Sequence, residues 1–149
     1  MTTKTRYTVI GAGHGGKAMA AHLGLMGFPT TLFNRTFERI EAIQERVGID
    51  LESSYTHLNA FCPLENVTSD LSEALETAEM IMIVIPSSAH AEVAKNCAPF
   101  LKDGQIIVLH PGRTCGAIEF AKVLRDEGCT ADVTISEAET FIYASRSDG

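Results

Sequence analysis

The chain has 149 residues, 45% of them hydrophobic and 21% charged, as in an ordinary globular protein long enough to bury a core. A formal net charge of −7, with 12 basic residues that form no cluster, excludes a nucleic-acid-binding surface. No apolar run reaches the roughly 18 residues that a membrane span needs, and no secretory apolar segment is present at the N-terminus, so we predict a cytoplasmic protein without membrane partners.

A short apolar strand predicted at residues 7–10 runs directly into a glycine-rich turn with the spacing G-x-G-x-x-G. In such a turn Gly11 permits the tight bend, Gly13 lets a phosphate approach the backbone, and Gly16 lets the following helix lie close to the sheet. Because the N–H groups at a helix start attract anions, we predict that the turn binds the pyrophosphate of a dinucleotide. The predicted contacts are Gly11, Gly13, His14, Gly15 and Gly16.

The same turn nearly matches the P-loop of nucleoside triphosphatases, which has Ser or Thr as a Mg²⁺ ligand after its Gly-Lys pair. Here Ala18 follows Gly16 and Lys17, and it has no ligand atom. The buried strand predicted at residues 80–85 ends in Pro86 rather than in Asp. Both metal-binding groups are absent, so this alternative is set aside.

The helix after the turn is expected at about residues 15–26, and Gly27 is a natural end for it. Gly16, Ala20 and Gly24 are spaced four residues apart, which places these small residues on one face. We therefore expect this face to pack tightly against the sheet.

The end of the second strand, predicted at residues 30–33, indicates which coenzyme is bound. An NAD site normally has Asp or Glu near this position to accept hydrogen bonds from the ribose. This chain has Asn34, Arg35 and Thr36 instead, and a guanidinium can bind a 2′-phosphate through two hydrogen bonds. NADP(H) is favoured, with NAD(H) as the alternative. The competing interpretation is a solvated arginine at a helix start after a turn-forming asparagine.

A second helix is predicted at residues 37–47 and is ended by Gly48. Its expected apolar stripe consists of Phe37, Ile40, Ile43 and Val47. Residues 49–67 are ambiguous: residues 49–51 and 58–61 could form a small hairpin, or Ser53, Ser54, Tyr55 and Pro63 could belong to a loop. Farther along, Asp70 resembles a helix start, with Glu73 at capping-box distance.

Strands and helices alternate through the rest of the chain. Strands are predicted at residues 80–85, 106–109 and 133–136, and helices at residues 89–97 and 117–127. This alternation is typical of an α/β protein of the Rossmann type, a doubly wound and mainly parallel sheet with helices on both faces. We expect one dinucleotide-binding domain over residues 1–145 and a polar tail at residues 146–149.

Four segments rich in Gly, Pro and polar residues follow the predicted strands, at Gly11–His14, Asn34–Phe37, Pro86–Ala89 and His110–Arg113. Ligands of such sheets bind beyond the carboxyl ends of the strands, so we expect these segments to form one continuous site. The further predicted coenzyme contacts are Pro86, Ser87 and His90. His14 could cover the pyrophosphate or be a simple turn residue, and His90 could contact the coenzyme or fill space.

The residues leave open a catalytic role for His14, His90 or His110, none of which has an obvious orienting acid, and they predict no metal site. There is no Ser-His-Asp ordering, and Glu137 and Glu139 fit a polar pair at a strand end better than an acid–base dyad. The cysteines lack a C-x-x-C pair, and no histidine lies at metal-ligand spacing from them, which favours free thiols. They are Cys62, Cys97, Cys115 and Cys129.

Residues 110–119 and 137–146 resemble the opine dehydrogenase family of the octopine/nopaline type. The segments at residues 11–17, 34–35 and 86–90 fit the same family, so the resemblance covers essentially the whole chain. His110 stands where the family pattern has Asn, and Cys115 where a small residue such as Gly is usual. The Asn-Arg-Thr end of the second strand is also similar to that of 6-phosphogluconate dehydrogenases, which supports NADP.

The resemblance implies reductive condensation of an amino acid with a 2-oxo acid by hydride from NAD(P)H. It implies that Arg113 and Thr140 face the substrate. It also implies that the catalytic histidine and its carboxylate partner belong to a second, mostly helical domain after Gly149. We therefore expect no catalytic residue in this chain and negligible activity in isolation.

Two alternatives differ in function class. One is the nucleotide-binding domain of a related dehydrogenase, acting for example on 6-phosphogluconate, glycerol 3-phosphate or a 3-hydroxy acid. The other is a non-enzymatic protein, either an NADP(H) sensor or a subunit that is completed by a partner chain. The possible partners are further copies of the chain, in a homo-oligomer, or a separate partner domain.

Overall fold

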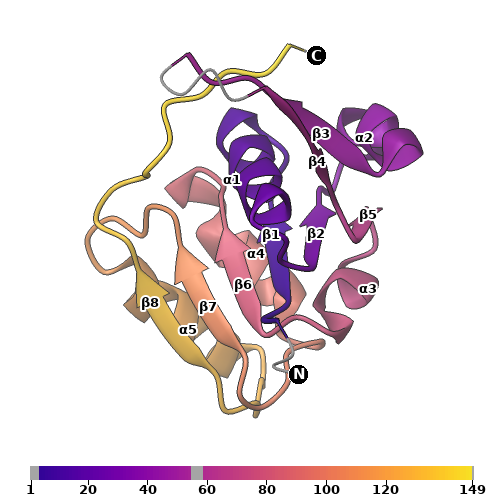
Figure 1. Cartoon of the computed structure of the whole chain (residues 1–149). Helices are drawn as coiled ribbons and strands as arrows, with labels where there is room; N and C mark the ends of the chain where they lie inside the picture. The colour runs from indigo at the N-terminus through magenta and orange to yellow at the C-terminus, as the bar shows by residue number, and fades with distance from the viewer. Residues whose placement is uncertain (1–3, 55–58, 149) are drawn as a thin grey trace.

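The computed structural model describes residues 4–54 and 59–148. Its centre is a six-stranded sheet in which every neighbouring pair of strands is parallel. The strands are β1 (Tyr7–Ile10), β2 (Thr30–Phe33), β5 (Asn66–Thr68), β6 (Met80–Ile83), β7 (Ile106–Leu109) and β8 (Thr134–Glu137). They lie in the order β5-β2-β1-β6-β7-β8 (Figure 1). This is the strand order of a Rossmann fold, and the predicted fold class is confirmed.

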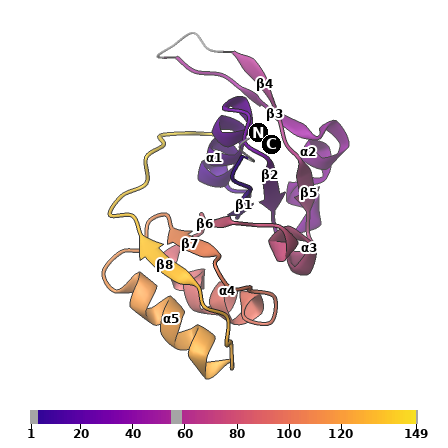
Figure 2. The same ribbon diagram turned by 60° about the horizontal axis from the view of Figure 1, so that its bottom comes forward.

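Helices cover both faces of the sheet (Figure 2). The α-helices are α1 (His14–Leu25), α2 (Glu41–Arg46), α3 (Leu71–Glu76), α4 (His90–Cys97) and α5 (Gly116–Asp126), and the 3₁₀ turns are η1 (Phe37–Arg39) and η2 (Ser87–Ala89). A separate antiparallel pair, β3 (Gly48–Leu51) with β4 (Ala60–Pro63), lies beside α1.

The core consists of two apolar clusters, one on each face. Successive side chains of a strand point to opposite faces, so Val9 joins the cluster under α1 while Ile10 joins the one under α3, α4 and α5. The first cluster also holds Met19, Leu23, Leu32 and Ile40, and the second Leu75, Ile83, Leu109, Phe120 and Leu124. Both faces are therefore buried, as a parallel sheet requires.

Several predicted elements are found within a few residues of their expected bounds. The strands at residues 7–10, 30–33 and 106–109 have the predicted limits, and α1 starts one residue earlier than expected. Asp70 caps α3 as predicted, because its carboxylate accepts the N–H groups of Ser72 and Glu73. The Glu73 carboxylate accepts hydrogen bonds from Asn66 and Thr68, in the unpredicted strand β5.

The single helix predicted at residues 37–47 is wrong. The segment is divided into η1 and α2, with a non-helical backbone at Ile40 between them. Of the expected apolar stripe only Ile40 is buried. The helix ends at Val47, which is left-handed (φ 49°), so that Gly48 can begin β3. A Cβ at Gly48 would lie 2.8 Å from the carbonyl oxygen of Cys62 in β4, so the pairing of the two strands favours glycine here.

The hairpin alternative for residues 49–67 is the correct one, with β3 and β4 as its strands. Tyr55 and Leu58, named in the two alternatives, lie outside the described residues. The hairpin also changes the predicted role of Gly24, where a Cβ would lie 2.3 Å from the carbonyl oxygen of Pro63. The small face of α1 is buried as expected, but at Gly24 it packs against β4 rather than against the main sheet.

Candidate dinucleotide-binding site

The strand order reverses between β1 and β6, and the glycine turn leaves β1 at this point. Gly11 has φ +110°, and a Cβ there would lie 2.3 Å from the carbonyl oxygen of Val84. A Cβ at Gly16 would lie 1.6 Å from the carbonyl oxygen of Gly11. Both positions therefore require glycine, because the turn folds back against its own backbone and the next strand.

Gly13 differs, since a Cβ there would meet no atom within 4 Å among the described residues. It is the N-cap of α1, and no side chain among those residues caps the helix. At Gly13 itself, the start of this 12-residue helix thus faces free space beside the glycine turn. Such a helix start attracts an anion through its unpaired N–H groups and its dipole.

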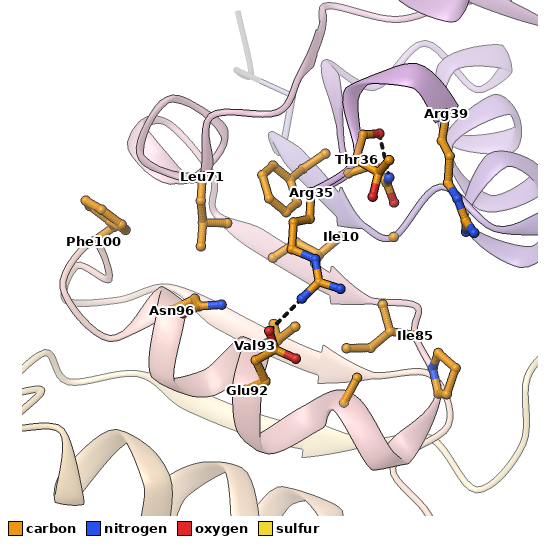
Figure 3. Close-up of a pocket in the computed structure, with 15 residues that line it drawn as sticks. Ile10, Arg35, Thr36, Arg39, Leu71, Ile85, Glu92, Val93, Asn96 and Phe100 are labelled. Atoms are coloured by element: carbon orange, nitrogen blue, oxygen red, sulfur yellow. Dashed lines mark hydrogen bonds and ion pairs between the residues drawn. The ribbon is translucent and has the colours of Figure 1, made fainter. Parts of the chain in front are cut away.

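A pocket of about 550 Å³ lies beside this turn, at the carboxyl ends of β1, β2 and β6 (Figure 3). It is lined by Ile10, Gly11, Phe33, Asn34, Arg35, Thr36, Arg39, Leu71, Ile85, Pro86, Ala89, Glu92, Val93, Asn96 and Phe100. Apolar walls with a few polar groups suit a flat aromatic base joined to a sugar. Three of the four loop segments predicted to form one site contribute residues to this pocket, but the segment His110–Arg113 contributes none.

Asn34 joins the glycine turn to the end of β2. Its side-chain oxygen accepts the N–H of Ala12 (3.1 Å), and its amide nitrogen donates to the carbonyl of Thr36 (2.9 Å). Asn34 therefore positions the turn while it also lines the pocket.

Two arginines line the pocket on the β2 side. The Arg35 guanidinium crosses to α4 and forms an ion pair with Glu92, with 2.5 Å between nitrogen and oxygen (Figure 3). Arg39 is exposed and forms no salt bridge with any other described residue.

Residues 6–115 match the family described as NAD-dependent glycerol-3-phosphate dehydrogenase N-terminus. The chain belongs to this family. It is also 38% identical over 148 residues to an opine dehydrogenase of Arthrobacter sp. (strain 1C), covering 99% of this chain. A glycerol-3-phosphate dehydrogenase [NAD(P)+] of Stenotrophomonas maltophilia (strain R551-3) is 34% identical over 110 residues, or 69% of this chain. The predicted resemblance to opine dehydrogenases is confirmed.

Solved structures support the same fold. An octopine dehydrogenase in complex with NADH and L-arginine has a TM-score of 0.81 and 20% identity, over 96% of this chain and 37% of its own. The glycerol-3-phosphate dehydrogenase of Coxiella burnetii has a TM-score of 0.65 and 23% identity, over 90% of this chain and 41% of its own. The chain spans 40% of the Arthrobacter relative's length and 29% of the Stenotrophomonas relative's.

In this family member, His14 and Gly15 face the C-terminal segment rather than the pocket. The Nδ1 atom of His14 accepts the N–H of Ser147 (2.9 Å), and a Cβ at Gly15 would lie 2.6 Å from the Phe141 ring. Residues 140–148 pass back from β8 along α1 (Figures 1 and 2). Contact of these two residues with a pyrophosphate stays a prediction.

Ser87 and His90 also lie outside the pocket lining, although Pro86 belongs to it. His90 is 0% exposed, and a Cβ at Gly116 would come within 3.7 Å of its ring. Burial lowers the pKa of His90, partly offset by the backbone of Ile85 and the charges of Glu119 and Glu137. This location favours the space-filling alternative for His90.

Arg113 and Thr140 are both exposed, beyond the carboxyl ends of β7 and β8. Arg113 and Cys115 have positive φ (54° and 66°), a backbone that favours glycine. The Glu137 carboxylate accepts the N–H of Ala117 (2.7 Å) and so caps α5 from the end of β8. This contact gives Glu137 a structural role. Contact of Arg113 and Thr140 with a substrate stays a prediction.

Sequence reasoning missed Arg39, Glu92 and Asn96 in the pocket. No sequence pattern indicates Arg39, because the backbone between Arg35 and Arg39 is extended at Thr36 and then forms the 3₁₀ turn η1. Glu92 and Asn96 are four residues apart on α4, but nothing in the sequence indicates which face of α4 meets β2. Among the described residues, all four cysteines are free thiols, no group of three or more potential metal ligands occurs, and no helix could span a membrane.

Proposed function

We propose that residues 1–145 form the coenzyme-binding domain of an opine-dehydrogenase-type oxidoreductase and bind a nicotinamide dinucleotide. The observation that carries the proposal is the open helix start at Gly13 beside a pocket that holds two arginines. The turn at Gly11, Gly13 and Gly16 would bind the pyrophosphate, and the pocket would hold the adenosine half. The bound coenzyme would supply hydride, while these residues bind and orient it.

The coenzyme is proposed to be NADP(H), with NAD(H) also accepted. Arg35 and Arg39 lie on one wall of the pocket and could both reach a 2′-phosphate. Arg35→Asp should weaken NADPH binding about tenfold or more and change NADH binding by less than about threefold. The protein is titrated into each reduced coenzyme and the change in coenzyme fluorescence is followed, which the protein does not disturb because it has no tryptophan. Arg125→Asp, on the exposed face of α5, makes the same charge change away from the pocket and should alter neither. An equal loss for both coenzymes in Arg35→Asp would contradict the proposed preference.

The proposed reaction is reductive condensation of an amino acid with a 2-oxo acid. The match to the opine dehydrogenase runs over 99% of the chain, whereas the Stenotrophomonas match covers 69% of it, which supports the opine class. Dehydrogenation of glycerol 3-phosphate is the second candidate, because the family matched by residues 6–115 is named after glycerol-3-phosphate dehydrogenase. Assays of the natural full-length protein with both substrate classes would separate the two.

For the 149-residue chain alone we expect coenzyme binding without turnover. Among the described residues, His14 is bonded to Ser147 and His22 to the Tyr143 hydroxyl, while His90 and His110 have buried ring nitrogens without hydrogen-bond partners. Turnover by the purified chain on any amino acid and 2-oxo acid pair would contradict this. Strong self-association, or co-purification with a helical protein, would favour the sensor or subunit alternative. The cytoplasmic location stays a prediction.

A further inference from the structure

The ion pair between Arg35 and Glu92 joins opposite walls of the coenzyme pocket. Arg35 follows β2, whereas Glu92 lies in the first turn of α4, 57 residues later. Both side chains line the pocket, and Figure 3 shows the guanidinium extending across the space between the two walls. A ligand group that binds to Arg35 therefore meets the Glu92 carboxylate as well.

The pair is exposed, with 75% of the Arg35 side chain and 57% of the Glu92 side chain accessible to solvent. Exposed pairs of this kind are weak, because water screens the charges and two long side chains must be held in one arrangement. A bound ligand can thus displace Glu92 from Arg35, but the carboxylate stays nearby.

Glu92 is the one acidic residue among those that line the described pocket. The segment Asn34–Thr36 lacks the carboxylate that an NAD site usually has after this strand. A 2′-phosphate would need Arg35 to leave Glu92 and would then lie close to a like charge. A ribose hydroxyl would need neither change.

We propose that Glu92 is a specificity-determining residue that holds Arg35 and disfavours a 2′-phosphate, so that the pocket accepts NAD(H) beside NADP(H). This inference rests on the proposed coenzyme function. It assigns to α4 the selective carboxylate that other sites carry at the end of the second strand.

The test uses the 149-residue chain, the variant Glu92→Gln and the control Glu127→Gln. Glu127 also pairs with a residue of α4, Lys95, at 3.4 Å, but it lies on the α5 side. Each protein is titrated calorimetrically with NADPH, NADH, 2′,5′-ADP and AMP, and its folding is checked by circular dichroism. Glu92→Gln should tighten NADPH and 2′,5′-ADP about fivefold and leave NADH and AMP within about twofold, since only the ligands with a 2′-phosphate bring a negative charge close to the carboxylate. Glu127→Gln should match the unmodified chain.

The gain should shrink in roughly 0.5 M salt, where charges are screened within a few ångströms. The gain should also shrink in an Arg35→Gln background. There the Glu92 carboxylate no longer competes for Arg35, and Glu92→Gln removes only its repulsion of the 2′-phosphate. If Glu92→Gln and Glu127→Gln bind all four ligands equally, or if the gain is unchanged without Arg35, the role of Glu92 is overturned while the coenzyme function stands. If the unmodified chain binds none of the four ligands, the proposed function itself fails.

Discussion

Gly13 and Gly16 lie three residues apart in one turn but have opposite surroundings. Gly13 has an ordinary φ of −74° and faces open space, whereas a side chain at Gly16 would collide with the backbone of Gly11. The first glycine is thus available for a ligand, and the second is needed for the turn to close. The two roles can be separated by the same substitution.

Gly13→Ala should fold with nearly unchanged stability but bind NADPH and NADH at least about tenfold more weakly, because its methyl group occupies the space proposed for the pyrophosphate. Gly16→Ala should lose roughly 3 kcal/mol or more of unfolding free energy, because the colliding atom is backbone. Urea denaturation and coenzyme titration measure the two effects. Strong coenzyme binding by Gly13→Ala would argue against the pyrophosphate site.

At the scale of elements, Gln105 connects the end of α3 to the segment that leads into β7, at the amino end of that strand. The residue is 4% exposed, and its side-chain amide nitrogen donates to the carbonyls of Leu75 (3.0 Å) and Ala78 (2.8 Å). Its side-chain oxygen accepts the N–H of Lys102 (2.8 Å). One residue before β7 therefore satisfies three backbone groups around the end of α3 and the turn before β7.

Gln105→Leu should reduce the free energy of unfolding by about 2–4 kcal/mol, because it leaves buried backbone groups without partners. Gln44→Leu is the matched control. Its amide donates one bond, to the carbonyl of Val67, from an exposed position, and its loss should cost less than about 1 kcal/mol. Chemical denaturation measures both values, and equal losses would show that the contacts of Gln105 do not stabilise this junction.

At the scale of the whole molecule, two histidines have ring nitrogens buried where protonation is costly. Burial lowers the pKa of both His90 and His110 below the ordinary value of 6.5. The unfolded chain therefore binds more protons than the folded one as the pH falls below about 6.5, and folding stability decreases in that range. Neutral histidines thus favour the folded state near pH 7.

Wild-type protein should lose stability between pH 7.5 and pH 5.5, and His90→Leu should lose less over the same range, because it removes one group that must be protonated on unfolding. Thermal unfolding at both pH values provides the comparison. The control is Leu124→Ala, which also removes a buried side chain from the cluster under α4 and α5 but no titratable group, and which should preserve the wild-type pH dependence. An identical pH dependence in all three proteins would contradict a role for His90.

Local patterns predicted the strands of the parallel sheet and the glycine turn well. Gly16 is required by a backbone collision with Gly11 within the turn, and Gly11 has a positive φ, so their spacing indicates the turn directly. The helix predicted at residues 37–47 failed because its backbone is not helical at Ile40, whose side chain is buried in the cluster under α1. Strand β5 was missed because its three residues carry too short a pattern.

By itself, the sequence determined the alternation of strands and helices, the Rossmann-type sheet and the glycine turn proposed for the pyrophosphate, since these depend on backbone chemistry between near neighbours. Only the tertiary structure decided that Glu92 meets Arg35, that Arg39 lines the same pocket and that Phe141 covers Gly15. The physical reason is the order of the strands. It places the ends of β2 and β6 on either side of β1, and so brings together side chains whose separation along the chain gives no sign of contact.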